Sequence, residues 1–137
     1  MKPRYMLDTN ICIHIRRNRP PAVMRRFAAA EPGSVVMSVI TYGELAYGVA
    51  KSGDAEAGRR LTALARLIPV LPMEDRVGPL YGRLRADLAA AGRLIGGNDL
   101  WIAAHARASD LTLVTNNVRE FERVDGLAIE DWTVEPA

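Results

Sequence analysis

Short apolar runs alternate along the chain with longer segments in which apolar residues recur at helical spacing. The first run, residues 5–8, ends abruptly in the carboxylate of Asp8. Comparable runs lie at residues 34–37, 69–72, 111–115 and 127–129. Strands that alternate with helices are typical of a mainly parallel sheet covered by helices on both faces. The pattern therefore predicts an α/β fold with a central sheet of four to five strands.

The helices between these runs are predicted from capping residues and from breaks in the pattern. Asp8 or Thr9 can cap the first helix, Ser38 the third and Asp54 the fourth, because their side-chain oxygens accept from free N–H groups. Pro21 can open the second helix. The predicted helices cover residues 9–17, 22–30, 39–50, 55–67, 76–91 and 99–109, with a further short element at 121–124.

Composition indicates a folded globular chain. With 137 residues, 49% of them hydrophobic and 25% charged, we expect a single domain spanning residues 1–137. No apolar run approaches the length of a membrane span and no signal-peptide core is present, so a cytoplasmic location is expected. Cys12 is the single cysteine, which excludes an intrachain disulfide and predicts a small core residue.

Charge adds a weaker indication about partners. The formal net charge of +2 is too small to indicate nucleic-acid binding by itself, but arginine is far commoner than lysine among the 18 basic residues. Arginine suits bidentate phosphate contacts, although a GC-rich genome also favours it over lysine. A basic cluster could therefore contact phosphates or form a solvated face, and both interpretations stay open for Arg16, Arg17, Arg19, Arg25 and Arg26.

Three acids lie at comparable points of the predicted fold. Asp8 ends the first strand, Glu44 lies on the helix after the second strand, and Asp99 begins the helix after a glycine-rich loop. Because the carboxyl ends of parallel strands share one edge of a sheet, these side chains can converge there. Thr115 and Asn117 follow a later strand and reach the same edge.

Converging carboxylates repel one another unless a cation lies between them. Oxygen ligands of this kind suit Mg²⁺ or Mn²⁺, which can activate a water against a phosphate. Taken singly, each acid is equally well explained as a helix cap or a solvated residue. His105, among alanines, is predicted to be a packed or hydrogen-bonded structural histidine, and Trp101 and Tyr47 to be core or interface residues.

Several other chemistries lack their residues. The chain contains neither G-x-x-x-x-G-K-[ST] nor G-x-G-x-x-G, so the sequence does not support a P-loop or a dinucleotide-binding fold. No nucleophile elbow is present. Asp8-Thr9-Asn10 also lacks the second aspartate of the haloacid-dehalogenase D-x-D pattern.

A specific family resemblance accompanies these features. The chain resembles PIN-domain ribonucleases, and in particular the VapC toxins of bacterial type II toxin–antitoxin systems, essentially from end to end. The resemblance is carried by Leu7-Asp8-Thr9-Asn10, Thr41–Gly48, Gly97-Asn98-Asp99, Val114-Thr115-Asn116-Asn117, Arg119-Glu-Phe121 and the closing Arg123–Trp132.

The resemblance implies a three-layer α/β/α PIN-like fold and a Mg²⁺- or Mn²⁺-dependent endoribonuclease. Asp8, Glu44 and Asp99 would form its acidic core, with Asp8 and Asp99 the direct metal ligands and Glu44 binding a second ion or orienting the attacking water. Many PIN domains carry a fourth aspartate where this chain has Asn117, so one cation or two remains open. Asn117, Thr115 and Asn10 are expected to have auxiliary roles.

The resemblance also implies partners and leaves two rival functions. It implies a transfer RNA substrate, a cognate VapB-type antitoxin and a homodimer. One rival is a catalytically silent PIN-like module that binds RNA or a partner, and the other is a metal-dependent phosphatase on the same topology. The intact acids Asp8, Glu44 and Asp99 argue against the silent module.

Overall fold

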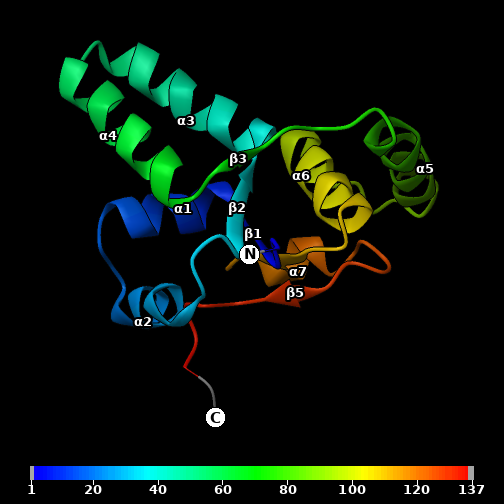
Figure 1. Cartoon of the computed structure of the whole chain (residues 1–137). Coiled ribbons are helices and arrows are strands. Elements are labelled where there is room, and N and C mark those ends of the chain that lie inside the picture. Colours follow the sequence, from blue (N-terminus) through cyan, green and yellow to red (C-terminus); the bar gives the residue numbers. More distant parts are fainter. Residues whose placement is uncertain (1, 136–137) are drawn as a thin grey trace.

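The computed structural model describes residues 2–135 and contains a five-stranded sheet between two layers of helices (Figure 1). The strand order is β3-β2-β1-β4-β5, and all four pairings are parallel. This confirms the predicted α/β class and strand number. The strands are β1 (Tyr5–Leu7), β2 (Val35–Ser38), β3 (Val70–Leu71), β4 (Thr112–Val114) and β5 (Ile129–Glu130).

Seven helices lie in the described part of the chain, and most begin and end close to their predicted limits. They are α1 (Thr9–Arg16), α2 (Pro21–Ala29), α3 (Val39–Ser52), α4 (Ala55–Leu67), α5 (Val77–Ala90), α6 (Gly97–Ala108) and α7 (Val118–Phe121). The three predicted caps form. Asp8, Ser38 and Asp54 accept hydrogen bonds from the N–H groups of Ile11, Ile40 and Glu56, respectively.

Several predicted boundaries were wrong by a few residues. Strand β2 begins after Ser34, because that residue closes a turn by donating from its hydroxyl to the Glu31 carbonyl, 2.6 Å away. Helix α6 begins two residues before Asp99, because the Leu100 N–H already bonds to the Gly96 carbonyl at 2.9 Å. Asp99 therefore lies inside the first turn, where negative charge favours the positive end of the helix.

The C-terminal part also differs from prediction. The short element is α7 rather than residues 121–124, because its first turn closes where the Phe121 N–H meets the Asn117 carbonyl at 3.3 Å. The last strand is β5 rather than residues 127–129, because pairing with β4 aligns Ile129 and Glu130 with Leu113 and Val114. Helix α3 runs past residue 50 to Ser52 and is ended by Gly53, whose φ of 65° is left-handed.

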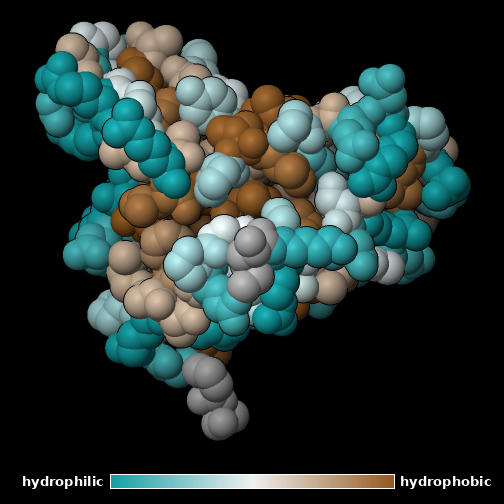
Figure 2. All heavy atoms as spheres, in the orientation of Figure 1, coloured by the Kyte–Doolittle hydropathy of each residue, from teal (hydrophilic) through white to brown (hydrophobic). Residues whose placement is uncertain are grey.

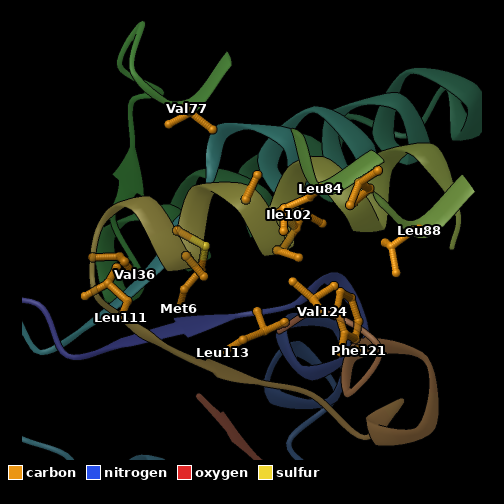
Figure 3. Close-up of a cluster of buried hydrophobic side chains, with 14 residues drawn as sticks. Met6, Val36, Val77, Leu84, Leu88, Ile102, Leu111, Leu113, Phe121 and Val124 are labelled. Carbon is orange, nitrogen blue, oxygen red and sulfur yellow. The ribbon is translucent and has the colours of Figure 1, made fainter. Parts of the chain in front are cut away.

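Alternate residues of each strand point to opposite faces of the sheet. Met6, Val36 and Leu113 are paired across neighbouring strands and face the layer of α5, α6 and α7. Figure 3 shows the Met6 and Leu113 side chains beneath α6, with Leu84, Leu88 and Phe121 closing the same cluster. The other face is covered by α1 to α4, whose buried residues pack on Leu7, Met37 and Val114.

Two side chains predicted to be structural lie in the interior. Cys12 is fully buried in the cluster beneath α1, and His105 is 1% exposed within α6. Tyr47, in contrast, is 67% exposed, which excludes the core and leaves the interface of the two predicted places. Figure 2 shows hydrophilic side chains over the outer helices and hydrophobic atoms in the middle of the visible face. No helix between residues 2 and 135 is both long and apolar enough to cross a membrane.

Candidate active site

Asp8 lies at the carboxyl end of β1, and both of its carboxylate oxygens are held by protein groups. Oδ1 accepts from the Ile11 N–H at 2.9 Å, and Oδ2 accepts from the Thr115 hydroxyl. The side chain is 5% exposed. Burial raises the pKa of Asp8 above its ordinary value, and the hydrogen bonds from Thr115 and Ile11 partly oppose that rise. The carboxylate is thus fixed in position at a site that disfavours its charge.

Glu44 projects from the second turn of α3 toward the start of α1. Its Oε1 accepts a 2.6 Å hydrogen bond from the Thr9 hydroxyl, which also lies 3.3 Å from the hydroxyl of buried Thr41. Thr9 directly follows Asp8 in the chain, so this contact places the second acid beside the first. The predicted convergence of Asp8 and Glu44 is therefore present in the fold, and the negative charge of Glu44 contributes to the raised pKa of Asp8.

Asp99 lies in the first turn of α6 and is half-buried. Burial, together with a hydrogen bond and charge repulsion from Glu120, raises the pKa of its carboxyl to about 7. Glu44 and Asp8 add further repulsion in the same direction. The three predicted acids therefore lie within electrostatic reach of one another, although 36 residues or more separate them along the chain.

Glu120 is a site residue that the sequence analysis missed. Its Oε1 accepts from the Gly96 N–H at 3.0 Å, and its Oε2 accepts from the side-chain amide of Asn117. Burial raises the pKa of Glu120, but the hydrogen bonds from Gly96, Asp99 and Asn117 outweigh burial and lower it overall. The pKa values of the two neighbouring carboxyls are therefore shifted in opposite directions, upward for Asp99 and downward for Glu120. One sequence feature could have indicated Glu120, because it is an acid three residues after Asn117 and lies within the Arg119-Glu-Phe121 motif.

The three predicted acids line one small hollow of about 120 Å³. It is lined by Asp8, Thr9, Asn10, Glu44, Asp99, Asn117 and Phe121. The structure thus brings together the three predicted acids and the auxiliary residues Asn10 and Asn117. Thr115 lies behind Asp8 instead of in the wall, where it also accepts from the Asn117 N–H at 2.9 Å.

The donor set fits a divalent cation held with water. Among residues 2–135, no three His, Cys, Asp or Glu side chains converge closely enough to enclose a metal by themselves. Mg²⁺ is commonly bound through one or two carboxylates and keeps several waters. The raised pKa values of Asp8 and Asp99 arise from burial and neighbouring negative charge, and a cation between the two carboxylates would offset both causes.

Trp101 lies next to the site without lining it. Its indole stacks on the Tyr81 ring, with centroids 3.7 Å apart and planes inclined by 7°. This contact joins α5 to α6 at the end that carries Asp99, so the interpretation of Trp101 as a packing residue holds. Ser38 and His105, whose side chains lie 2.8 Å apart, join α6 to the start of α3 in a similar way.

Comparison with known proteins agrees with this arrangement. Residues 5–127 match the model of the PIN domain. The tRNA(fMet)-specific endonuclease VapC of Shigella flexneri is 43% identical over 131 residues, covering 95% of this chain and 98% of that protein. The ribonuclease VapC2 of Rickettsia felis is 38% identical over 130 residues, covering 93% of this chain and 97% of that protein.

Solved structures show the same fold. VapBC-1 from nontypeable Haemophilus influenzae superimposes with a TM-score of 0.88 at 40% identity, covering 98% of this chain and all of that one. VapBC2 from Rickettsia felis, bound to a DNA fragment from its promoter, gives 0.86 at 36% identity, covering 96% of this chain and 99% of that one. The chain therefore belongs to the PIN-domain family, among the VapC ribonucleases.

Proposed function

We propose that this chain is the toxin of a type II toxin–antitoxin system and cuts RNA by Mg²⁺- or Mn²⁺-dependent hydrolysis. The observation that carries the proposal is the convergence of Asp8, Glu44 and Asp99 from three separate elements on one polar hollow. A cation bound there would activate a water and offset the charge that builds up on the phosphate during in-line attack. We further propose that residues 1–137 act as one PIN domain.

The side chains of this site can divide the work between them. Asp8 and Asp99 would hold the cation, since their pKa values are raised by burial and by neighbouring negative charge. Glu44 is anchored through one oxygen by Thr9, which leaves its other oxygen to accept a hydrogen bond from the attacking water. Many PIN domains carry a fourth aspartate at the position of Asn117. In this chain, Glu120 would supply the negative charge that Asn117 lacks.

Substrate and partners follow from the relatives. The Shigella flexneri relative is a tRNA(fMet)-specific endonuclease, which supports transfer RNA as the substrate class. Two of the similar structures are VapBC complexes, which supports a VapB-type antitoxin as the partner of this chain. We propose that the toxin forms a homodimer within that complex.

The mechanism is tested with isosteric variants that remove one charge each. Asp8→Asn and Asp99→Asn should each lower the rate of RNA cleavage by roughly 100-fold or more, because each removes an electrostatic group at the reacting phosphate. Asp87→Asn is the matched control, since Asp87 is exposed on α5. EDTA should abolish cleavage, and added Mg²⁺ or Mn²⁺ should restore it.

The result of the same assay separates the alternatives. Undiminished cleavage by both Asp8→Asn and Asp99→Asn would exclude the proposed mechanism. RNA binding without cleavage at any Mg²⁺ or Mn²⁺ concentration would favour the catalytically silent module. Hydrolysis of a small phosphomonoester but not of RNA would favour the phosphatase.

A further inference from the structure

A basic hollow lies at the far end of α3 from the acidic site. It measures about 530 Å³ and lies where the end of α1, the end of α3 and the start of α4 meet. Its lining includes three arginines, Arg16, Arg17 and Arg60, around the small residues Gly48 and Ser52. All three arginines are exposed. The hollow is therefore a concave, positively charged surface open to solvent.

The arginines of this hollow are available to a ligand. Among residues 2–135, ion pairs form between Arg25 and Glu135, Arg26 and Glu130, Arg59 and Glu56, and Arg76 and Glu74. None of these pairs involves the three arginines of the hollow. Its one lining acid, Asp54, uses Oδ1 to accept from the Glu56 N–H at 3.0 Å. Excess positive charge therefore remains for an anion.

Five arginines were treated as one basic cluster from the sequence, and the structure divides them between different surroundings. Arg25 and Arg26 are held by carboxylates of the C-terminal segment, whereas Arg16 and Arg17 line the hollow. Gly48 borders open space, since a Cβ there would meet no heavy atom within 4 Å. Phosphate groups, which arginine binds through paired N–H donors, suit such a site.

Helix α3 links the basic hollow to the catalytic acids, because its residues line both. A second hollow of about 570 Å³ shares Thr9 and Glu44 with the acidic one and extends along α3 to Tyr47. Gly48, which lines the basic hollow, lies one turn after Glu44 on α3, and residues four apart are neighbours on a helix surface. Figure 1 shows α1 and α3 running away from the sheet in the same direction, and the two helices are in contact. Glu44 and Ser52 are about 12 Å apart along α3 at the helical rise.

We propose that this basic hollow binds backbone phosphates of the RNA substrate, a few nucleotides from the bond that is cut. The inference rests on the proposed function, because the ligand is its RNA. The acidic hollow repels the RNA backbone except where a cation intervenes, so attraction has to come from elsewhere on the path of the strand. The arginines at the end of the same helix supply that attraction.

The test compares two triple variants with the same net charge. The first is Arg16→Ala/Arg17→Ala/Arg60→Ala, and the control is Arg59→Ala/Arg66→Ala/Arg83→Ala, three exposed arginines outside the basic hollow. Both triple variants are made in a Glu44→Gln parent, which slows cleavage but keeps the proposed cation ligands Asp8 and Asp99. Binding of a long labelled single-stranded RNA and of a trinucleotide is followed by fluorescence anisotropy in Mg²⁺. Circular dichroism verifies folding, and Arg60→Glu alone replaces the triple variant if that variant does not fold.

The expected result is specific to the basic hollow and to long RNA. The first variant should bind long RNA roughly tenfold more weakly than the Glu44→Gln parent, while the control stays within about twofold. The slope of log affinity against log salt should fall by about 2, since three phosphate contacts are lost. Binding of the trinucleotide, which is too short to reach from the acids to the arginines, should be the same in both variants.

Three results would overturn the inference. Equal weakening by the control variant would mean that only net charge matters. Equal weakening of trinucleotide binding would mean that the arginines support the fold or the acidic site. Displacement of long RNA by polyglutamate as effectively as by unlabelled RNA would identify an acidic protein segment as the ligand. Tight RNA binding through these arginines, with no cleavage by the wild type in Mg²⁺ or Mn²⁺, would support this inference and refute the proposed function.

Discussion

The Thr115 hydroxyl donates a hydrogen bond to Oδ2 of Asp8, a contact between residues 107 positions apart. It follows from the register of the sheet, which pairs Leu7 with Val114 and so brings the next residue of each strand together. Because Ile11 holds the other oxygen of Asp8, the carboxylate is oriented by the protein before any cation binds. Thr115 therefore positions Asp8.

Thr115→Val should weaken Mn²⁺ binding and RNA cleavage by about 10- to 100-fold, as is usual when a group that orients a metal ligand is lost. Thr115→Ser keeps the hydroxyl and should restore most of both. Affinity is measured by Mn²⁺ electron paramagnetic resonance and cleavage with a labelled RNA. Thr112→Val, earlier on the same strand, is the control and should have little effect on either. A valine variant with wild-type Mn²⁺ affinity would rule out the positioning role.

Glu120→Gln should also weaken Mn²⁺ binding by about 10- to 100-fold, because it removes a negative charge in contact with Asp99. Glu122→Gln, an exposed acid two residues later, is the control. Adding Asn117→Asp to Glu120→Gln returns one negative charge next to position 120 and should recover part of the Mn²⁺ affinity. If Glu120→Gln and Glu122→Gln behave alike in the titration, Glu120 is not part of the cation site.

Much of the fold follows from local rules that can be applied to the sequence. Asp8, Ser38 and Asp54 each cap the helix that they were predicted to cap, because capping depends on a side chain and N–H groups two or three residues away. The parallel sheet follows from the alternation of strands and helices. The start of α6 did not follow, because two glycines gave no cap from which to place it.

The site was predictable as far as it depends on strand ends. Asp8, Glu44, Asp99 and Asn117 could be brought together because parallel strands end at one edge. Glu120 could not be found in that way, because it reaches the site from a short helix after the strand and depends on how that helix packs beside Gly96. The sequence could not decide between core and interface for Tyr47 for a similar reason, since the packing of α3 determines which of its faces is exposed.

The Cys12 thiol should be inert in the folded protein. Burial raises its pKa, and the negative charge of Asp8 raises it further, so the reactive thiolate is disfavoured. Iodoacetamide should label native protein at least about 100-fold more slowly than protein in urea, since reaction requires opening of the core. Lys51→Cys places a thiol on an exposed turn of α3 and is the positive control. Labelling of Cys12 at the rate of that exposed thiol would contradict the buried assignment.

His105 should lower the free energy of unfolding in mildly acidic solution, where protonation of Asp99, with its pKa of about 7, acts in the opposite direction. Burial lowers its pKa below 6.5, aided by Arg76 and partly opposed by the Pro72 carbonyl and Glu74. The Ser38 hydroxyl lies 2.8 Å from Nδ1 of the ring and forms a hydrogen bond with it. Burial favours the neutral form of this imidazole. Between the lowered folded pKa and 6.5 the unfolded chain binds more protons, and the free energy of unfolding decreases as pH falls.

The test of this pH dependence is urea unfolding of wild type and His105→Asn from neutral pH down to about pH 5. Asparagine keeps a hydrogen-bonding group for Ser38 but does not titrate and is smaller than histidine, so the variant should be about 1–3 kcal/mol less stable at neutral pH. It should also lose the part of the acid-dependent decline that begins near 6.5. His14→Asn, at the half-buried second histidine, is the control and should keep that decline. If His105→Asn declines as steeply as wild type, another group is responsible for the acid sensitivity.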